Sequence, residues 1–530
     1  MSLEKITYNN SNYFSKTVID YLSQKETISP FYNNFPNLEG FKKQIDLKKT
    51  TIQKTSRNVL VETLKKQYKN LNTTTKTLQN ISFLSKENTF TITTGHQLNL
   101  FTGPLYFLYK IISTINLCEQ LKAEFPNNNF VPIYWMATED HDFEEIKFFN
   151  FNTKKISWNK ESNGAVGRLS TEGLELIFEE ISKLFGISDN AERLKVLFKK
   201  SYLEHPNLTD ATRFLTNKLF EKYGLVILNA DDAALKKTFI PFIEDELVNQ
   251  TSFNEISKTN KQFSKNYKIQ VNPRELNLFY LTDKLRERIL LENGKYKINN
   301  TSITFTKQAL LNEINKHPER FSPNVIMRPL YQEVILPNLC YIGGGGELAY
   351  WLQLKAYFER TNVVFPILLL RNSALIINSK QTQKLDKLSL SKKDLFLKQS
   401  NLITKIITES SNLNLDFSEQ KKFLKNQFLH LKDIASQTDK SFIGAVKAQE
   451  KKQLNGLDNL EKRLLNAEKR KLKDTTERII KIQDVLFPKK SLQERTLNFS
   501  DLYLEYGDVL IPQLKEYLKP LDIEFSILSL

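Results

Sequence analysis

The chain has 530 residues, with 76 Lys and Arg against 60 Asp and Glu, and a net charge of +16 at pH 7. This length exceeds one ordinary domain, so we expect roughly two or three folded units. No uninterrupted apolar run approaches the roughly 20 residues of a membrane-spanning helix, which argues against a membrane protein. The N-terminal stretch MSLEKITYNN lacks the apolar segment of a signal peptide, and we expect a cytoplasmic protein.

The cysteine content and the net charge limit the kinds of site and ligand that the chain is expected to have. The two cysteines, Cys118 and Cys340, lie in apolar patterns, which predicts buried free thiols in a reducing compartment. Without a CxxC motif, no structural zinc site is expected. The excess of Lys favours a solvated basic face, with an anionic ligand as the second interpretation. A nucleic-acid surface ranks third, because no helix-turn-helix or aromatic stacking pattern accompanies the charge.

In chain order, residues 1–89 show helix-like spacing of apolar residues and are predicted to be helical. A short strand, Phe90–Thr93, then ends in Gly95-His96-Gln97. A helix follows Pro104, with apolar residues at spacings of three and four that give it one buried face. A second strand, Phe130–Met136, leads into the tetrad Glu139–Asp142. The order strand, helix, strand predicts a parallel sheet with polar residues at its carboxyl edge.

Two segments interrupt this pattern and are predicted to be insertions, at about 150–200 and about 255–318. The second contains the alternation of a hairpin, Tyr296–Phe305. Between the insertions, the buried strand Leu225–Leu228 ends in the polar residues 229–232.

The stretch after the second insertion combines apolar runs with a glycine cluster. Four of the sixteen glycines, Gly343–Gly346, stand between an apolar run and a helix predicted over Glu347–Glu359. Such a turn lets backbone approach a ligand closely, although a purely structural loop is the alternative. A further strand is predicted over Val363–Leu370, and Arg371 follows it.

The C-terminal third is predicted to form an antiparallel coiled-coil arm of long helices, interrupted at Gly444 and Gly456. Its apolar seam has the spacing 3,4,3 over Leu457, Leu460, Leu464 and Ala467. The domain prediction is a core over 1–375, an arm over 376–487, and a segment over 488–530 that returns to the core. Such an arm commonly mediates self-association, so a homodimer is expected.

The candidate site residues carry charge or hydrogen-bonding groups at the strand ends. His96 could act as a general acid or base or as a donor to phosphate charge, with a satisfied core histidine as the alternative. The three carboxylates of the tetrad repel one another unless a cation or polar substrate lies among them. Substrate binding is favoured there, and a helix cap or a metal site stays open. Lys110, Arg328 and Arg371 are candidate anion contacts, with a surface lysine and structural ion pairs as alternatives.

Four stretches together resemble the cysteine-adding ligases of bacillithiol biosynthesis: TTGHQLNLFTGPLYFLYKII, VPIYWMATEDHDFEEI, RPLYQEVILPNLCYIGGGGELAYWLQL and SLQERTLNF. The resemblance covers nearly the whole chain in order. It implies an α/β fold with a Rossmann-like parallel-sheet core, related in shape to class I aminoacyl-tRNA synthetases. It also implies two inserted connecting-peptide subdomains and a C-terminal α-helical coiled coil that makes a dimer. The implied reaction adds L-cysteine to glucosaminyl malate, the last step to bacillithiol.

Under this resemblance, amide formation requires an activated carboxylate, which ATP supplies, with or without Mg²⁺, as an acyl phosphate or acyl adenylate. No permanently bound cofactor or protein-held metal is expected. The catalytic candidates are His96, Asp140 and His141. The substrate or nucleotide contacts are Gly95, Gln97, Asn99, Thr102, Gly103, Lys110, Trp135, Glu139, Asp142, Arg328, Gln332, Gly343, Gly344, Gly345, Gly346, Glu347 and Trp351.

The HIGH and KMSKS motifs of class I synthetases are absent, so their mechanism is not carried over to residues of this chain. Two other functions compete with the ligase. A metal-dependent hydrolase would use the tetrad, and a nucleic-acid-associated coiled-coil protein would use the basic charge.

Overall fold

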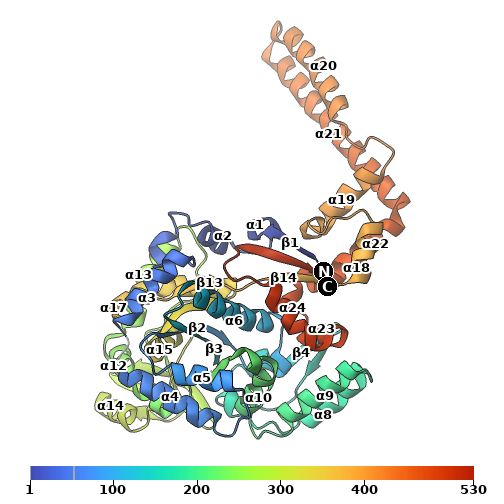
Figure 1. The fold of residues 1–530 in the computed structure, drawn as a ribbon. Helices are drawn as coiled ribbons and strands as arrows, with labels where there is room; N and C mark the ends of the chain where they lie inside the picture. Colours follow the sequence, from blue (N-terminus) through green and yellow to red (C-terminus); the bar gives the residue numbers. More distant parts are fainter. Residues whose placement is uncertain (1, 52–53) are drawn as a thin grey trace. The chain divides into compact units, whose positions relative to one another are not determined.

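The computed structural model describes residues 2–51 and 54–530, and these divide into two compact units (Figure 1). The larger unit comprises Leu3–Leu375 and Ser491–Leu528. The smaller unit comprises Ile376–Lys490 together with a few residues at the two ends of the chain.

A five-stranded parallel sheet forms the centre of the larger unit, in the order β13-β12-β2-β3-β6. Its strands are β2 (Thr89–His96), β3 (Asn129–Met136), β6 (Val226–Asn229), β12 (Asn338–Gly343) and β13 (Ile367–Leu370). All eight residues of β2 are buried, as expected for a parallel strand covered on both faces. The chain adds β3 and β6 on one side of β2 and later adds β12 and β13 on the other. The strand order therefore reverses at β2, and in open α/β sheets ligands bind at such a switch point.

The helix α6 (Tyr106–Glu124) connects β2 to β3, which confirms the predicted strand-helix-strand unit. The prediction of one buried face was wrong, because α6 is buried on all sides from Phe107 to Cys118. It packs on β2, β3 and β12, and α24 (Leu510–Tyr517) covers it from another direction. Cys118 and Cys340 are free and belong to one apolar cluster under the sheet, which confirms that the thiols are buried.

The first predicted insertion contains the antiparallel pair β4 (Phe148–Phe151) and β5 (Lys154–Ser157). The helices α8 (Leu174–Phe185) and α9 (Asp189–Tyr202) follow, and α10 (Leu208–Phe220) leads back to β6.

The second predicted insertion contains α13 (Thr251–Phe263) and α14 (Lys307–Lys316) around a five-stranded antiparallel sheet of order β10-β9-β8-β7-β11. The predicted hairpin is β9 (Lys295–Ile298) paired with β10 (Thr304–Phe305). The other strands of this sheet are β7 (Leu278–Thr282), β8 (Leu285–Glu292) and β11 (Phe321–Pro323).

The N-terminal region was predicted to be entirely helical, but it begins with the strand β1 (Ser2–Thr7). The strand pairs with β15 (Glu524–Ser529) in a three-stranded sheet of order β1-β15-β14, with β14 at Ala374–Ile377. A partner at the opposite end of the chain leaves no local signal. The helices α2 (Lys16–Leu22), α3 (Leu38–Lys49), α4 (Lys54–Tyr68) and α5 (Thr75–Phe83) then follow.

The strand and the helix next to the glycine cluster differ from the prediction. The strand predicted over Val363–Leu370 is β13 at Ile367–Leu370 only, and Pro366, which has no N–H to donate, stands directly before it. The helix after the glycines begins at Gly345 rather than Glu347 and divides into α16 (Gly345–Trp351) and α17 (Lys355–Arg360). Before β12, the chain forms α15 (Met327–Ile335).

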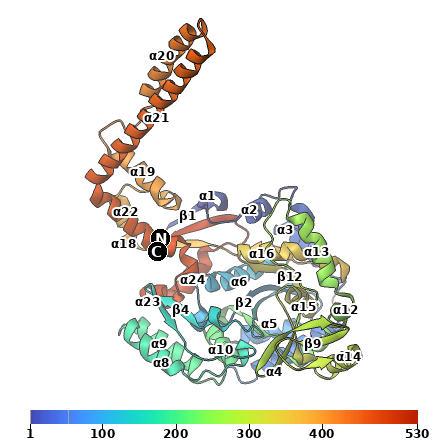
Figure 2. The same cartoon turned by 180° about the vertical axis from the view of Figure 1, so that it is seen from behind.

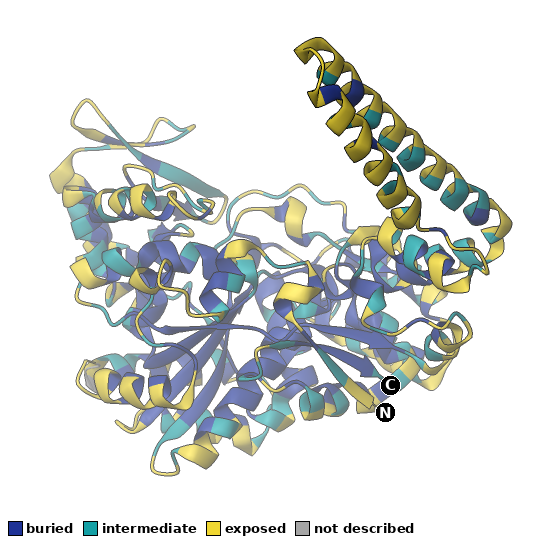
Figure 3. Ribbon diagram, turned by 90° about the horizontal axis from the view of Figure 1, so that it is seen from above, coloured by how far each residue is buried: buried dark blue, intermediate teal, exposed yellow. Residues whose placement is uncertain are grey.

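The smaller unit consists mainly of α18 (Ser379–Lys387), α19 (Gln399–Ser410), α20 (Ser418–Ser436), α21 (Lys440–Lys471) and α22 (Lys473–Leu486). The helices α20 and α21 form an antiparallel hairpin (Figure 2), and much of its surface is exposed (Figure 3). Phe428, Ala435 and Val446 form its apolar cluster.

Gly444 and Gly456 lie inside α21 and do not interrupt it, contrary to the prediction. Leu460 is 52% exposed and lies outside the seam, so the predicted spacing was wrong at that residue. Among the described residues of both units, none of the helices has the length and apolarity needed to cross a membrane.

Candidate active site

The carboxyl ends of β2, β3 and β12 surround a cavity of about 460 Å³, which we call the His96 cavity. It lies at the point where the strand order reverses, where α/β sheets hold their ligands. The predicted site residues that line it are Gly95, His96, Gln97, Lys110, Trp135, Arg328, Gly344, Gly345, Gly346 and Glu347.

His96 is the last residue of β2 and is 8% exposed. Its Nε2 atom is buried and has no hydrogen-bond partner among the described residues. Burial, followed by the Lys110 cation, lowers the pKa of His96 to about 3, so the imidazole is neutral at neutral pH. A buried polar atom without a partner is costly. A ligand in the cavity is therefore the natural partner of Nε2.

The buried Lys110 and the half-buried Glu347 form an ion pair in the same wall, with Nζ 2.7 Å from Oε2. Lys110 Nζ also donates to the Gly95 carbonyl at 2.7 Å. Glu347 further accepts hydrogen bonds from the Tyr341 hydroxyl at 2.7 Å and the Gly344 N–H at 2.8 Å. Burial raises the pKa of Glu347, but Lys110 and these hydrogen bonds lower it overall. Both side chains thus serve mainly to fix this wall.

The four glycines differ in what their neighbours allow. A Cβ at Gly343 would lie 2.9 Å from the Glu347 Cβ, so packing alone requires glycine there. A Cβ at Gly345 would meet Val18 at 3.0 Å. A Cβ at Gly346 would meet nothing within 4 Å, and the residue faces the cavity. Neither packing nor a positive φ explains the glycine at that position. Close approach of a ligand does explain it.

The two arginines that flank the strands are paired differently. Arg371 Nη2 lies 2.7 Å from Glu494 Oε1 in a buried ion pair, which is the structural alternative considered for it. Arg328 has no carboxylate within 4.0 Å among the described residues. It donates to Gln332 at 3.1 Å and to the Tyr350 hydroxyl at 3.2 Å.

A second cavity of about 490 Å³ adjoins the first, and we call it the Arg286 cavity. The two cavities share the wall formed by Trp135, Ala137, Val325 and Arg328. The predicted residues Glu139, Asp140 and His141 line this second cavity, and the inserted antiparallel sheet supplies Phe279 and Arg286.

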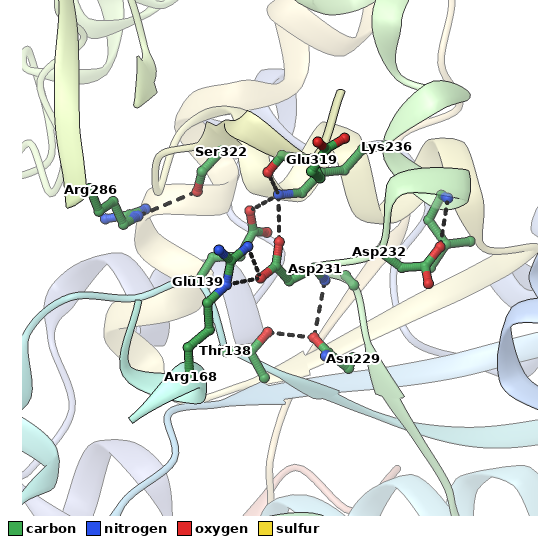
Figure 4. Close-up of polar contacts among 12 residues, drawn as sticks. Thr138, Glu139, Arg168, Asn229, Asp231, Asp232, Lys236, Arg286, Glu319 and Ser322 are labelled. Carbon is green, nitrogen blue, oxygen red and sulfur yellow. Dashed lines mark hydrogen bonds and ion pairs between the residues drawn. The ribbon is translucent and has the colours of Figure 1, made fainter. Parts of the chain in front are cut away.

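The carboxylates of the tetrad have separate protein partners. Glu139 Oε1 lies 2.6 Å from Lys236 Nζ, which also lies 2.7 Å from Asp231 Oδ1, and Arg168 approaches Asp231 at 2.8 Å (Figure 4). Asp142 caps the short helix α7 (Phe143–Ile146), which is the structural alternative considered for the tetrad. Cations from elsewhere in the chain therefore relieve much of the predicted repulsion. No cluster of three or more His, Cys, Asp or Glu side chains suited to a metal ion occurs in the part of the chain that the structure describes.

Asp140 is the carboxylate of the tetrad that connects the two cavities. It accepts a hydrogen bond from Gln97 Nε2 at 2.9 Å and from the backbone N–H of His141 at 2.7 Å. Burial acts to raise the pKa of Asp140. The hydrogen bonds from His141 and Gln97 and the Arg286 guanidinium outweigh it and hold that pKa well below its usual range. Asp140 is therefore an ionised acceptor at neutral pH.

The remaining predicted contacts lie outside both cavities, and several have structural partners, but the Thr102 hydroxyl and Trp351 Nε1 are buried without a hydrogen-bond partner among the described residues. Asn99 donates to the Glu145 carbonyl at 3.1 Å, and the Gly103 carbonyl accepts from Asn498 at 2.6 Å. Gln332 donates to Glu333 at 3.0 Å. The other members of this group are Thr102, Asp142, Gly343 and Trp351, and the Trp351 ring stacks on Tyr341.

Several lining residues were not predicted from the sequence: Tyr106, Glu145, Arg274, Phe279, Arg286, Tyr341, Tyr350 and Arg495. Most of them come from elements other than the strand ends. Arg286 lies in a half-buried strand of the second insertion, where period-2 alternation gives no sign of a ligand. The conspicuous aromatic content around Gly343 was the available signal for Tyr341 and Tyr350.

A family model described as bacillithiol biosynthesis BshC, N-terminal Rossmann-like domain, matches residues 1–372, and the C-terminal coiled-coil domain of BshC matches 374–530. A solved structure named as an arginyl-tRNA synthetase, from Campylobacter jejuni, covers 84% of this chain and 98% of its own at 11% identity. Its TM-score of 0.21 is too low to indicate a shared fold.

Curated relatives named as cysteine ligase BshC align along almost their full length. The protein from Flavobacterium johnsoniae is 58% identical over 530 residues, covering 100% of both chains. The protein from Christiangramia forsetii is 57% identical and covers 99% of this chain and 98% of its own. That from Salinibacter ruber is 30% identical and covers 87% of each. With its Rossmann-like core and C-terminal coiled coil, this chain belongs to the bacillithiol biosynthesis BshC family of ligases.

Proposed function

We propose that this enzyme joins the carboxylate of L-cysteine to the amine of glucosaminyl malate, with ATP activating the carboxylate. The observation that carries the proposal is the pair of cavities that share one wall at the carboxyl edge of the sheet. Two substrates held on either side of Trp135 and Arg328 would meet at that wall. Holding reactants together in this way contributes a large part of the rate in bond-forming enzymes. The relatives' name, cysteine ligase, supports the same reaction.

The proposed chemistry has two steps. First, a carboxylate oxygen of cysteine attacks ATP, which releases ADP or pyrophosphate and leaves an acyl phosphate or acyl adenylate. Then the sugar amine attacks the acyl carbon, the amide bond forms, phosphate or AMP leaves, and the amine loses a proton. The His96 cavity suits the nucleotide phosphates, since Gly345, Gly346 and Arg495 line it.

The electrostatics of His96 favour one role over another. A group with a pKa of about 3 is a weak base at neutral pH, so His96 is poorly suited to take the proton from the amine. A hydrogen bond from the other ring nitrogen to the Thr102 backbone leaves Nε2 as an acceptor in the neutral imidazole. We therefore assign His96 to accept a hydrogen bond from a donor group of the bound ligand. Asp140, ionised and at the border of the two cavities, is the acceptor placed to orient the amine.

The test is product analysis by mass spectrometry after the purified protein is incubated with L-cysteine, glucosaminyl malate and ATP. The expected result is a product equal in mass to both substrates minus water, formed only when ATP is present. Detection of AMP or of ADP then distinguishes the adenylate from the acyl phosphate. Absence of the product while the protein is folded would refute the assignment. An ATP-independent product would refute the activation step.

We also propose that the enzyme is a cytoplasmic homodimer. The hairpin of α20 and α21 exposes large apolar side chains that a second copy could cover: Phe423, Leu429, Leu431, Ile434 and Phe442. Exposed apolar surface of this extent commonly marks an interaction site. Light scattering after gel filtration tests the proposal, and Phe423→Lys is expected to shift the mass to that of a monomer. A monomeric wild-type protein would exclude the dimer.

A further inference from the structure

More cations than acids line the Arg286 cavity: Arg274, Arg286 and Arg328 against Glu139 and Asp140. Lys236 pairs with Glu139 at 2.6 Å, and hydrogen-bond donors surround Asp140. By contrast, neither Arg286 nor Arg328 has a carboxylate within 4.0 Å in the ranges 2–51 and 54–530. Both guanidinium groups line the same cavity. The walls therefore present a surplus of positive charge to whatever occupies it.

Arg286 is held in place by neutral neighbours. Its guanidinium lies over the Phe279 ring at 4.0 Å from the ring centre. Nη1 lies 2.7 Å from His141 Nδ1. Nε donates to Ser322 Oγ at 3.3 Å (Figure 4). Because a guanidinium can only donate, His141 must accept at Nδ1, which leaves its other ring nitrogen to hold the proton. Two of five guanidinium donors are thus used, and three stay available for a ligand.

Arg328 has a similar arrangement at the wall between the cavities. The Trp135 and Tyr341 rings lie 5.8 and 5.6 Å from its guanidinium carbon. Its two hydrogen bonds go to the neutral groups of Gln332 and Tyr350. Stacked, pre-oriented arginines of this kind bind carboxylates through two parallel hydrogen bonds. Nearby carboxylates such as Asp140 act on Arg286 from beyond ion-pair distance, and a further anionic group in the cavity would offset the remaining repulsion between the two guanidiniums.

We propose that Arg286 and Arg328 are the specificity-determining residues for a dicarboxylate, and that the Arg286 cavity receives the malyl part of the amino-sugar substrate. This inference rests on the proposed function for the identity of the substrate. The inserted antiparallel sheet thereby supplies a substrate-binding residue, Arg286 of β8. The nucleotide occupies the neighbouring His96 cavity, and the sugar amine points toward the shared wall.

Titration calorimetry of the full-length protein tests the inference without catalysis. The probes are glucosaminyl malate, its dimethyl ester, which lacks both negative charges, and ADP. Wild type is expected to bind the diacid about ten- to a hundredfold more tightly than the ester. Arg286→Gln is expected to lose about that factor for the diacid and nothing for the ester. Its affinity for ADP is expected to stay unchanged.

Arg288→Gln is the matched control, because Arg288 lies two residues along β8 and lines neither cavity. Its affinities are expected to equal those of wild type. Equal binding of diacid and ester by wild type would overturn the inference, as would a selective loss of ADP binding in Arg286→Gln. Arg286→Lys keeps the charge but loses the planar fork, so intermediate affinity for the diacid is expected. Failure of product formation with intact diacid selectivity would refute the proposed reaction and leave this site standing.

Discussion

The ion pair of Lys110 and Glu347 allows a quantitative prediction about the wall of the His96 cavity. Lys110 is 3% exposed, whereas the Glu347 side chain is 26% exposed, so replacing Lys110 by methionine leaves a half-buried carboxylate without its cation. Breaking a fully buried pair costs about 3–5 kcal/mol. Glu347 keeps its hydrogen bonds from Tyr341 and Gly344, so the expected destabilisation lies toward the lower end of that range.

Urea unfolding followed by tryptophan fluorescence measures this change. All three tryptophans, Trp135, Trp158 and Trp351, are buried in the larger unit, so the signal reports that unit. Lys110→Met should lower the free energy of unfolding by about 3 kcal/mol. The double variant Lys110→Met/Glu347→Gln removes both charges and should recover most of the loss.

The difference in stability between wild type and Lys110→Met should change with pH in one direction. In wild type the pKa of Glu347 is lowered, so its contribution to stability is present above its ordinary pKa of 4.5 and is lost as pH falls through the folded value. In Lys110→Met, burial is no longer opposed by the cation, and we expect the pKa of Glu347 to rise. The penalty is then present at neutral pH and disappears as the carboxyl is protonated. The stability difference between the two proteins should therefore narrow from about pH 7 to about pH 5.

A Lys110→Met protein as stable as wild type would refute the importance of the pair. A double variant no more stable than the single one would refute the attribution to an unpaired carboxylate. The reasoning would also fail if the stability difference widened on acidification.

Three further predictions concern single residues. Gly346→Ala should leave stability unchanged or slightly raised, because its Cβ meets open space, but it should weaken ATP binding in calorimetry. Gly343→Ala should lower the melting temperature, because its Cβ would lie 2.9 Å from the Glu347 Cβ. His96→Phe removes the unpartnered Nε2 atom but also the hydrogen bond to the Thr102 backbone, so it should fold with a modest loss of stability. It should lower kcat by about a hundredfold or more, and the wild-type rate should show no titration of His96 above about pH 5. Burial raises the pKa of Asp501 to about 6, so wild-type stability should rise as pH falls from about 7 to about 5, and Asp501→Asn should be more stable at pH 7 and lose this dependence in thermal denaturation.

The parallel sheet was predictable because buried strands leave a local pattern. The runs at Phe130–Met136 and Leu225–Leu228 are apolar throughout and end in polar residues, and the structure has β3 and β6 there. The strand β1 was not predictable, because its partner β15 comes from the far end of the chain. Helix burial on all sides, as in α6, likewise depends on what packs around it rather than on its own spacing.

Part of the candidate site followed from the sequence by one rule, that carboxyl ends of parallel strands meet at one edge. That rule brought His96 and Asp140 together, and Gln97 indeed bridges to Asp140 at 2.9 Å. It could not foresee that Lys236 would neutralise Glu139 or that Glu494 would neutralise Arg371. Both partners lie on other elements, and only tertiary packing selects them.

The ion pairs seen in the structure therefore distinguish structural from ligand-binding polar residues better than the clustering of those residues in the sequence does. Glu139, Glu347 and Arg371 look reactive in the sequence, yet each has its charge offset by a buried or nearby partner. Among the residues that line the two cavities, His96 Nε2 and the Arg286 and Arg328 guanidiniums keep unused hydrogen-bonding capacity. A ligand that completes these groups gains binding energy without breaking any existing pair. The residues that fix the walls and those that meet the substrates are consequently different sets, and substitutions in the two sets should affect stability and affinity separately.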